Sequence, residues 1–330
     1  MKTTLVLINR IKAALRSVYD ILAAPLVLMS AVSMKISRRY IQSYGSMPVS
    51  KFIFSKIGVF PIQAHYYEPL FTFNEQDLQH RWSKRRCLPG IDLNVNGQLT
   101  LLAQCNYSSE LSEIPDKKTN STEFYYRNGM FGHGDADYLY NMIRYFKPGK
   151  FVEIGSGFST LMARKAMQQN SVSEAGYHCE HICIEPYEAK WLDGSGARIY
   201  RKRVEEMEKQ VFNMLGRNDM LFIDSSHIIR PGGDVLMEYL EILPSLQPGV
   251  IVHIHDIFTP FYYPREWMVN KRLFWNEQYL VEALLTMNTK YEVISALHYL
   301  WTEHTEAFSA KFPKVTRNNA LPCSLWIRKL

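Results

Sequence analysis

The chain has 330 residues, of which 47% are hydrophobic and 21% charged, and this ordinary globular composition excludes disorder of the whole chain. Residues 1–67 hold nine Lys or Arg and one acid, so this segment carries +8 and the remainder −2 of a net charge of +6. The excess basic charge is therefore confined to the N-terminal segment, and the body shows no sign of a nucleic-acid-binding surface.

An apolar stretch from Ile21 to Met34 dominates the first 50 residues, and it contains Pro25. Fourteen residues fall short of the roughly 20 that span a bilayer, and a cleaved signal peptide fits poorly because the basic region is long. We therefore expect an interfacial or re-entrant helix in residues 1–40 on an anionic membrane surface, and a cytoplasmic protein at the inner face of the membrane. The alternative is a helix docked on the protein's own body. The flanking basic residues are Arg10, Lys12, Arg16, Lys35, Arg38 and Arg39.

Residues 51–130 are rich in aromatic residues and turn formers, and they predict an irregular cap that faces the substrate. From Asp135 onward helices and strands alternate, which predicts an α/β fold with a doubly wound, mostly parallel sheet in residues 131–330. Expected helices cover 135–146, 160–169, 204–215, 234–243 and 275–287, and expected strands cover 151–154, 182–185, 197–200, 220–224, 250–255, 291–296 and 323–328.

The five cysteines are odd in number and irregularly spaced, which argues against a disulfide framework and fits a reducing compartment. Cys179 and Cys183 lie near His178 and His181 and raise the question of a zinc site. The segment reads as a strand, however, and strand residues four apart are separated by about 13 Å. That separation is too large for one ion, so we expect no metal in this segment.

The segment from Phe151 to Thr160 (FVEIGSGFST) is an apolar strand that breaks at Gly155 and Gly157 and then continues as a helix. Glycines permit a sharp turn and a close approach of the backbone to a ligand. The third glycine of the dinucleotide fingerprint is replaced by Thr160, so a pyrophosphate cradle is disfavoured.

This turn, with Glu153 two residues before the first glycine, resembles motif I of the class I S-adenosylmethionine-dependent methyltransferases. The segments 221–227 (LFIDSSH) and 248–264 (PGVIVHIHDIFTPFYYP) are similar to a bacterial subgroup of these enzymes. The resemblance covers residues 130–330 and implies a seven-stranded Rossmann-like sheet closed by an antiparallel pair of strands. Two departures are Ser159, where many members have glycine, and an insertion near 171–178.

Four expected strands end on or next to an acid, namely Glu153, Glu185, Asp224 and Asp256. Ligands of open parallel sheets bind beyond the carboxyl ends of the strands. The resemblance implies that Glu185 accepts hydrogen bonds from the ribose hydroxyls of S-adenosylmethionine. The residues that we predict to bind this cofactor are Glu153, Gly155, Gly157, Ser159, Glu185 and Asp224.

Methyl transfer needs a group that takes the proton of the acceptor. Our candidates are His227, His255 and Asp256, which should meet at the same edge of the sheet. His253 shares a face with His255 and is expected to be covered by a helix.

The resemblance extends to catechol O-methyltransferase, in which acids at the ends of the fourth and fifth strands hold magnesium. Asp224 and Asp256 occupy those places in chain order, and His227 suits a softer metal. The neighbour expected to supply an amide oxygen is Ile257 here.

The aromatic loop after the fifth strand is placed to cover the site and exclude water. We expect Tyr262 and Tyr263 in this loop, and Asn276 and Glu277 in the following helix, to contact the substrate. For the last two residues, a helix-start cap is the alternative role.

The sequence thus predicts a methyltransferase, acting by O-methylation on a small-molecule, glycan or lipid-linked acceptor. One alternative keeps the fold and makes His227, His255 and Asp256 the ligands of an iron-dependent oxygenase. Another is a membrane-associated scaffold without catalytic activity.

Overall fold

The computed structural model describes residues 2–63, 67–69, 82, 84–120, 122–187 and 190–330. The chain divides into two compact units, Met1–Leu78 and Gln79–Leu330. The buried hydrophobic residues of the described chain run from Leu93 to Ile327, so the core belongs to the second unit. The domain borders expected near residues 50 and 130 stay a prediction.

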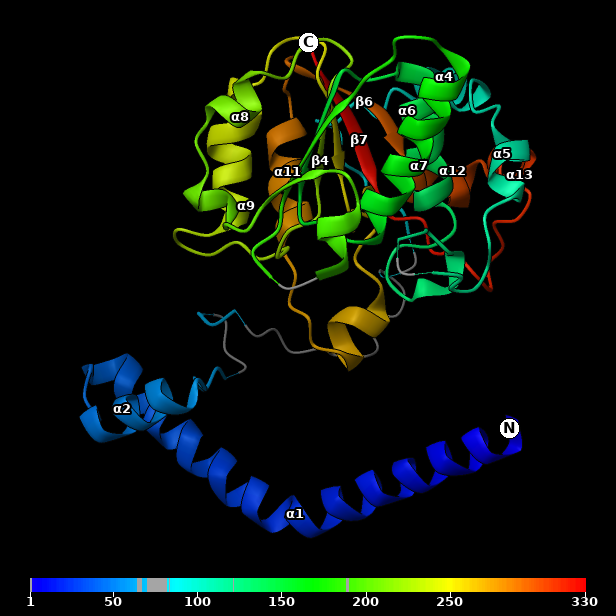
Figure 1. The fold of residues 1–330 in the computed structure, drawn as a ribbon. Coiled ribbons are helices and arrows are strands. Elements are labelled where there is room, and N and C mark those ends of the chain that lie inside the picture. The colour runs from blue at the N-terminus through cyan, green and yellow to red at the C-terminus, as the bar shows by residue number, and fades with distance from the viewer. Residues whose placement is uncertain (1, 64–66, 70–81, 83, 121, 188–189) are drawn as a thin grey trace. The chain divides into compact units, whose positions relative to one another are not determined.

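The N-terminal unit consists of α1 (Lys2–Tyr44) and α2 (Pro48–Ile57). Helix α1 has Pro25 in its interior and is bent (Figure 1), as a helix that lacks one backbone donor is expected to be. The side chain of Arg38 on α1 forms an ion pair with Glu68 at 2.7 Å and stacks over the ring of Phe60.

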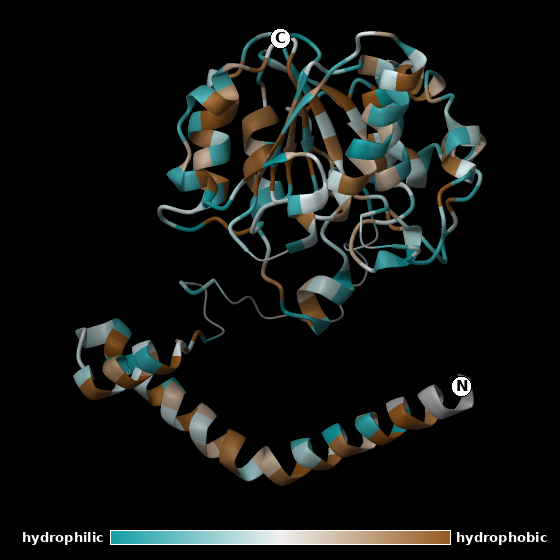
Figure 2. Cartoon of the chain, viewed as in Figure 1, coloured by the Kyte–Doolittle hydropathy of each residue, from teal (hydrophilic) through white to brown (hydrophobic). Residues whose placement is uncertain are grey.

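Within α1, residues 10–44 are long and apolar enough to cross a membrane, judged by length and composition alone. A signal sequence near the N-terminus would meet the same criterion. Hydrophobic residues recur along α1 (Figure 2), and most of its described apolar side chains are exposed. The apolar stretch counted in the sequence began after Asp20 and had fourteen residues. If Asp20 is included as the one charged residue, residues 17–34 form a stretch of 18 residues. The helix itself is therefore longer than the apolar run predicted.

The second unit is built on a seven-stranded sheet in the order β3-β2-β1-β4-β5-β7-β6. The first five strands of this order are parallel, and β7 runs antiparallel to both β5 and β6. This arrangement confirms the predicted mostly parallel α/β sheet closed by two late strands. The bounds are β1 (Lys150–Ile154), β2 (Glu180–Ile184), β3 (Arg198–Tyr200), β4 (Met220–Ile223), β5 (Ile251–Ile254), β6 (Tyr291–Ala296) and β7 (Leu325–Lys329).

Helices cover both faces of the sheet, and Figure 1 shows α8, α9 and α11 on one side and α4, α6 and α7 on the other. The described α-helices of this unit are α4 (Val95–Ala103), α5 (Ser108–Ser112), α6 (Asp135–Phe146), α7 (Phe158–Ser173), α8 (Gln210–Asn213), α9 (Asp234–Met237), α10 (Leu243–Ser245), α11 (Glu277–Leu285), α12 (Leu297–Glu303) and α13 (Thr305–Lys311). Short 3-10 turns cover Tyr126–Asn128, Lys190–Gly194 and Val204–Glu206, and π-helical turns cover Glu238–Ile242 and Glu266–Asn270.

Some elements differ from their predictions. The helix expected over 204–215 is split into a 3-10 turn and α8, and the helix expected over 234–243 contains a π-helical turn between α9 and α10. The region expected to be irregular includes α4 and α5, which are too short to show a sustained apolar period. His253 is buried as predicted, and its ring stacks on Phe222 with the centroids 4.1 Å apart.

Candidate functional site

Three neighbouring strands end together at the glycine turn between β1 and α7. Gly155 donates its N–H to the carbonyl of Ile184, and Asp224 donates to the carbonyl of Ile154. Gly155 has φ +78°, and a Cβ there would lie 1.9 Å from the carbonyl oxygen of Asp224. Only glycine fits this close approach of β1 and β4. The turn therefore fixes the rim on which Glu185 and Asp224 stand.

Glu185 and Asp224 line one cavity of about 200 Å³ together with Gly155. The carboxylate of Glu185 accepts from the N–H of Ser156 at 3.1 Å and from the N–H of Tyr187 at 2.8 Å. Each of these two hydrogen bonds uses one lone pair of a different carboxylate oxygen, so each oxygen keeps a further lone pair for a ligand. Other residues that line the cavity include Arg203, Glu205, Arg230 and Asp234.

Glu153, in contrast, does not reach this cavity. It lies inside β1 with no exposed surface, and its side chain contacts Thr160, His181 and Cys183 beneath α7. The prediction of a direct cofactor contact by Glu153 is therefore wrong, because the alternation of the strand turns its side chain under the helix. Ser159 is likewise buried at the start of α7.

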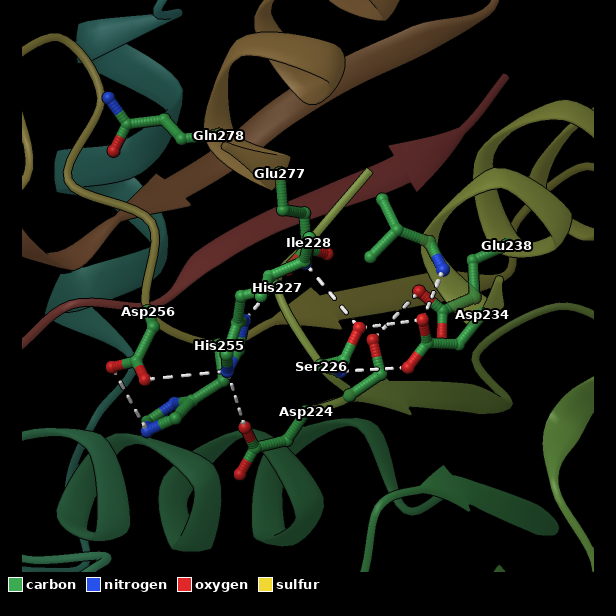
Figure 3. Close-up of polar contacts among 12 residues, drawn as sticks. Asp224, Ser226, His227, Ile228, Asp234, Glu238, His255, Asp256, Glu277 and Gln278 are labelled. Carbon is green, nitrogen blue, oxygen red and sulfur yellow. Dashed lines mark hydrogen bonds and ion pairs between the residues drawn. The ribbon is translucent and has the colours of Figure 1, made fainter. Parts of the chain in front are cut away.

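His227 occupies the centre of a second group of acids (Figure 3). Its Nε2 lies 3.3 Å from Asp224 and 3.6 Å from Asp256, and its Nδ1 lies 2.8 Å from Glu277. Three carboxylates thus surround one imidazole. His227 and Asp256 have φ of +60° and +55°, which is uncommon for residues other than glycine and accompanies functional sites.

The charges of this group shift the pKa values of its members. Burial alone would lower the pKa of His227, but hydrogen bonds to Asp224 and Glu277 outweigh it and raise the pKa well above its ordinary value. Burial alone would raise the pKa of Asp224, but the nearby His255 and His227 hold it below its ordinary value. The imidazole and the carboxylate therefore favour their charged forms.

Glu277, at the first turn of α11, is fully buried and accepts from Tyr239 at 2.8 Å as well as from His227. A side chain without exposed surface does not contact a substrate, so the predicted substrate role is wrong and Glu277 orients His227 instead. Asn276 accepts from the N–H of Ile229 at 2.7 Å, which is a structural contact of the same helix start.

A second, larger cavity has a volume of about 800 Å³. His255 and Asp256 both line it, and the Nε2 of His255 lies 3.8 Å from the carboxylate of Asp256. Trp275 also lines it and contacts the ring of His227 with the centroids 4.3 Å apart. Further lining residues are Tyr126, Arg127, His133, Asp135, Trp267, Lys271, Asn318, Asn319 and Cys323.

The aromatic loop contributes different residues from those predicted. Tyr263 is buried and accepts from the N–H of Gln278 at 3.0 Å, and Tyr262 packs against Arg86 and Trp82. Neither tyrosine lines the two cavities. The predicted substrate contact of Tyr263 is wrong because its ring is buried, whereas Tyr262 is half-buried and its substrate contact stays a prediction.

Trp267 and Trp275, together with the buried Asp135, are among the cavity residues that the sequence argument did not name as site residues. Trp267 belongs to the same aromatic loop and Trp275 precedes α11, so the local richness in aromatic residues was the available signal.

Asp224, His227 and Asp256 each present one donor atom within 4.8 Å of the others, so they form a group that is able to hold a metal ion. His255 belongs to a different group, with Asp256 and Cys323. Among the residues that the structure describes, the two histidines therefore do not converge with Asp256 on one point. The two-histidine, one-carboxylate iron site considered from the sequence is not assembled.

Part of this chain matches a known protein family. Residues 152–257 match the family described as a methyltransferase domain. An uncharacterized protein of Archaeoglobus fulgidus is 29% identical over 174 residues, which cover 48% of this chain and 75% of that protein. A crystal structure described as an O-methyltransferase from Bacillus cereus in complex with SAH is 12% identical with a TM-score of 0.32, and it covers 67% of this chain and 89% of that chain.

A TM-score of that size does not establish a common fold, so the assignment depends on the sequence match. The matched residues begin in β1 and end just after Asp256, and they include the glycine turn and both rim acids of the smaller cavity. Residues 152–257 are therefore a methyltransferase domain, in a chain that resembles the class I S-adenosylmethionine-dependent methyltransferases.

Proposed function

We propose that the protein is an S-adenosylmethionine-dependent O-methyltransferase that acts on a hydroxyl of a small-molecule, glycan or lipid-linked acceptor. One observation carries this proposal: two cavities are joined by a row of three side chains. Asp224 lines the smaller cavity, Asp256 lines the larger one, and His227 contacts both carboxylates. A cofactor held in the first would face an acceptor held in the second across His227.

The residues of the smaller cavity suit a cofactor that has a cation and no phosphate. Glu185 offers carboxylate oxygens to the two hydroxyls of a ribose, and Asp224 offers negative charge at the end toward His227. Gly155 lines the cavity, although the place of its missing side chain is filled by the close carbonyl of Asp224, whereas Gly157 has open space beside it.

When bound, S-adenosylmethionine supplies an electrophilic methyl group that an oxygen nucleophile attacks in line. The protein then has to hold the acceptor, exclude water and accept a proton. His227 and Asp256 are the groups at the border of the larger cavity that accept this proton, and His255 stands next to Asp256. Because the pKa of His227 is raised, its neutral form becomes populated at higher pH than for an ordinary histidine. Transfer should accordingly become faster as the pH rises.

A divalent metal ion at Asp224, His227 and Asp256 is the second candidate for this step. Glu277 fixes the Nδ1 of His227, which directs Nε2 toward the two carboxylates, and a carboxylate behind the histidine is usual for a metal ligand. The donor set therefore fits an ion such as Mn²⁺. When bound there, the ion would lower the pKa of the acceptor hydroxyl.

The test is calorimetric titration of S-adenosylmethionine and S-adenosylhomocysteine into the wild-type protein and Glu185→Ala. Loss of the hydrogen bonds to the ribose should weaken binding about tenfold to a hundredfold. Glu208→Ala, which removes an exposed acid outside the cavity, is the matched control and should bind as the wild type does. Unchanged affinity in Glu185→Ala rejects the ribose assignment, and absence of binding by the wild type rejects the proposed function.

Repeating the titration with Mn²⁺ and with Asp256→Asn separates the two candidates for proton removal. A metal-assisted enzyme should bind Mn²⁺ in the wild type and lose that binding in the variant. We further propose that the N-terminal unit holds the protein at the inner face of an anionic membrane, with the apolar residues of α1 toward the lipid.

A further inference from the structure

Three metal-binding side chains meet beneath the glycine turn, away from both cavities of the proposed reaction. Glu153 lies on β1, and His181 and Cys183 lie on the neighbouring β2. Glu153 and Cys183 are partners in the parallel register, and His181 precedes Cys183 by two residues and shares its face of the strand. The side chains of Glu153 and His181 have no exposed surface, and Cys183 is fully buried as well.

The contacts among these side chains are unevenly distributed. One carboxylate oxygen of Glu153, Oε2, lies 2.8 Å from His181 Nε2, 3.2 Å from Cys183 Sγ and 2.7 Å from Thr160 Oγ1. The other oxygen, Oε1, is buried without a partner, and so is Nδ1 of His181. A carboxylate oxygen has two lone pairs, so three donors on one oxygen and none on the other do not match a carboxylate that is satisfied by hydrogen bonds.

We propose that Glu153, His181 and Cys183 bind a structural zinc ion. Their donor atoms are separated by 2.8, 3.2 and 3.5 Å, which places a common centre about 1.9 Å from each atom. Zinc bonds of about 2.0 to 2.3 Å fit such a triangle when the ion lies slightly out of its plane. A thiolate, an imidazole and a carboxylate together are a donor set that selects zinc over magnesium or calcium.

Charge balance supports the same conclusion. A carboxylate and a thiolate would neutralise a divalent cation, so that a neutral unit is buried rather than a carboxylate with one unpartnered oxygen. The hydroxyl of Thr160 lies 2.7 Å from Oε2 of Glu153 and 4.0 Å from Sγ of Cys183. Such an ion would tie β1 to β2 directly before Gly155 and Glu185, which line the smaller cavity.

The sequence argument against a metal in this segment considered Cys179 with Cys183, four residues apart on one strand. Cys179 lies outside the group of three, but His181 and Cys183 of the same segment belong to it. The third ligand instead comes from the neighbouring strand, whose register with β2 is a property of the folded sheet.

The experiment replaces the ion with cobalt, because Co²⁺ bound to a thiolate has a sulfur-to-metal absorption band in the near ultraviolet. The side chains are inaccessible, so the full chain is produced in cells grown with Co²⁺ in place of Zn²⁺, which lets the ion enter during folding. We expect about one cobalt ion with thiolate absorption per chain, and at least a tenfold loss of that band in Cys183→Ala.

Three matched variants identify the site. Cys179→Ala removes a buried thiol of the same segment, Cys323→Ser removes the sulfur of the other group that contains a cysteine, and Asp256→Asn disables the site near His227. All three should keep the band, and a band that survives in Cys183→Ala overturns the proposal. If Cys183→Ala does not fold, native mass spectrometry of the wild type decides, since a mass equal to the bare chain contradicts a bound ion.

Discussion

His227 and Asp256 both adopt positive φ, and they lie on loops that follow two neighbouring strands, β4 and β5. Each such conformation costs about 1 to 3 kcal/mol and persists only where the surroundings hold it. For His227 those surroundings include the buried Glu277, which accepts hydrogen bonds from His227 and from the buried Tyr239. The strain is therefore balanced by contacts that direct Nε2 of His227 toward Asp224 and Asp256.

Glu277→Gln should lower the pKa of His227, because it removes one of the carboxylates that outweigh the effect of burial. A raised pKa stabilises the fold below the pKa of the unfolded chain, and this contribution is lost as the pH rises through the folded value. The unfolding free energies of wild type and variant should therefore differ most at acidic pH and converge at alkaline pH. Nuclear magnetic resonance of labelled histidine rings in metal-free protein measures the shift directly.

Tyr239→Phe is the matched control for that measurement. It removes the hydrogen bond to Glu277 but leaves the carboxylate in place, so the pKa of His227 should change much less than in Glu277→Gln. Equal shifts in the two variants, or none in either, would contradict the orienting role of Glu277.

At the scale of elements, the turn between β1 and α7 depends on one glycine more than on the other. Gly155→Ala forces a Cβ to within 1.9 Å of the carbonyl oxygen of Asp224, the residue directly after β4, at positive φ. We expect a loss of more than about 3 kcal/mol of unfolding free energy, or no soluble protein.

Gly157→Ala is the control for this prediction, because a Cβ there meets nothing within 4 Å and the backbone is extended. Its cost should stay below about 1 kcal/mol in urea unfolding followed by circular dichroism. Equal stability losses in the two variants would show that the close approach of β1 and β4 is not what selects glycine at residue 155.

The sequence predicted these elements where the local pattern is strong. The apolar runs of β1, β4 and β5 are buried on both faces, which makes them visible as continuous hydrophobic segments. The gathering of Asp224, His227 and Asp256 followed from the rule that parallel strands end at one edge. Glu277 was assigned a wrong role because its burial depends on how α11 packs on the sheet, which no local pattern records. The burial of Glu153 was missed although the predicted and the observed strand both end at Ile154, because which side chains of β1 are covered by α7 depends on how the helix packs on the sheet.

At the scale of the whole molecule, the two units differ in what they bury. The second unit has the sheet and the core, whereas α1 in the first exposes a series of apolar side chains, among them Leu22, Leu26 and Leu28. Basic residues lie on both sides of this apolar stretch and concentrate the positive charge of the chain there. This combination suits a membrane surface better than water.

The full chain should therefore bind vesicles that contain anionic lipid, and a chain of residues 79–330 should remain in solution, as measured by flotation. Replacing Arg10, Lys12 and Arg16 by Gln tests how α1 binds, since each basic residue near an anionic surface contributes about 1 kcal/mol. An interfacial helix should lose most of its binding in this variant and at high salt. A helix that spans the bilayer should keep its binding in both conditions, because its apolar length holds it there. Full-length protein that stays in solution with anionic vesicles would contradict membrane association in either form.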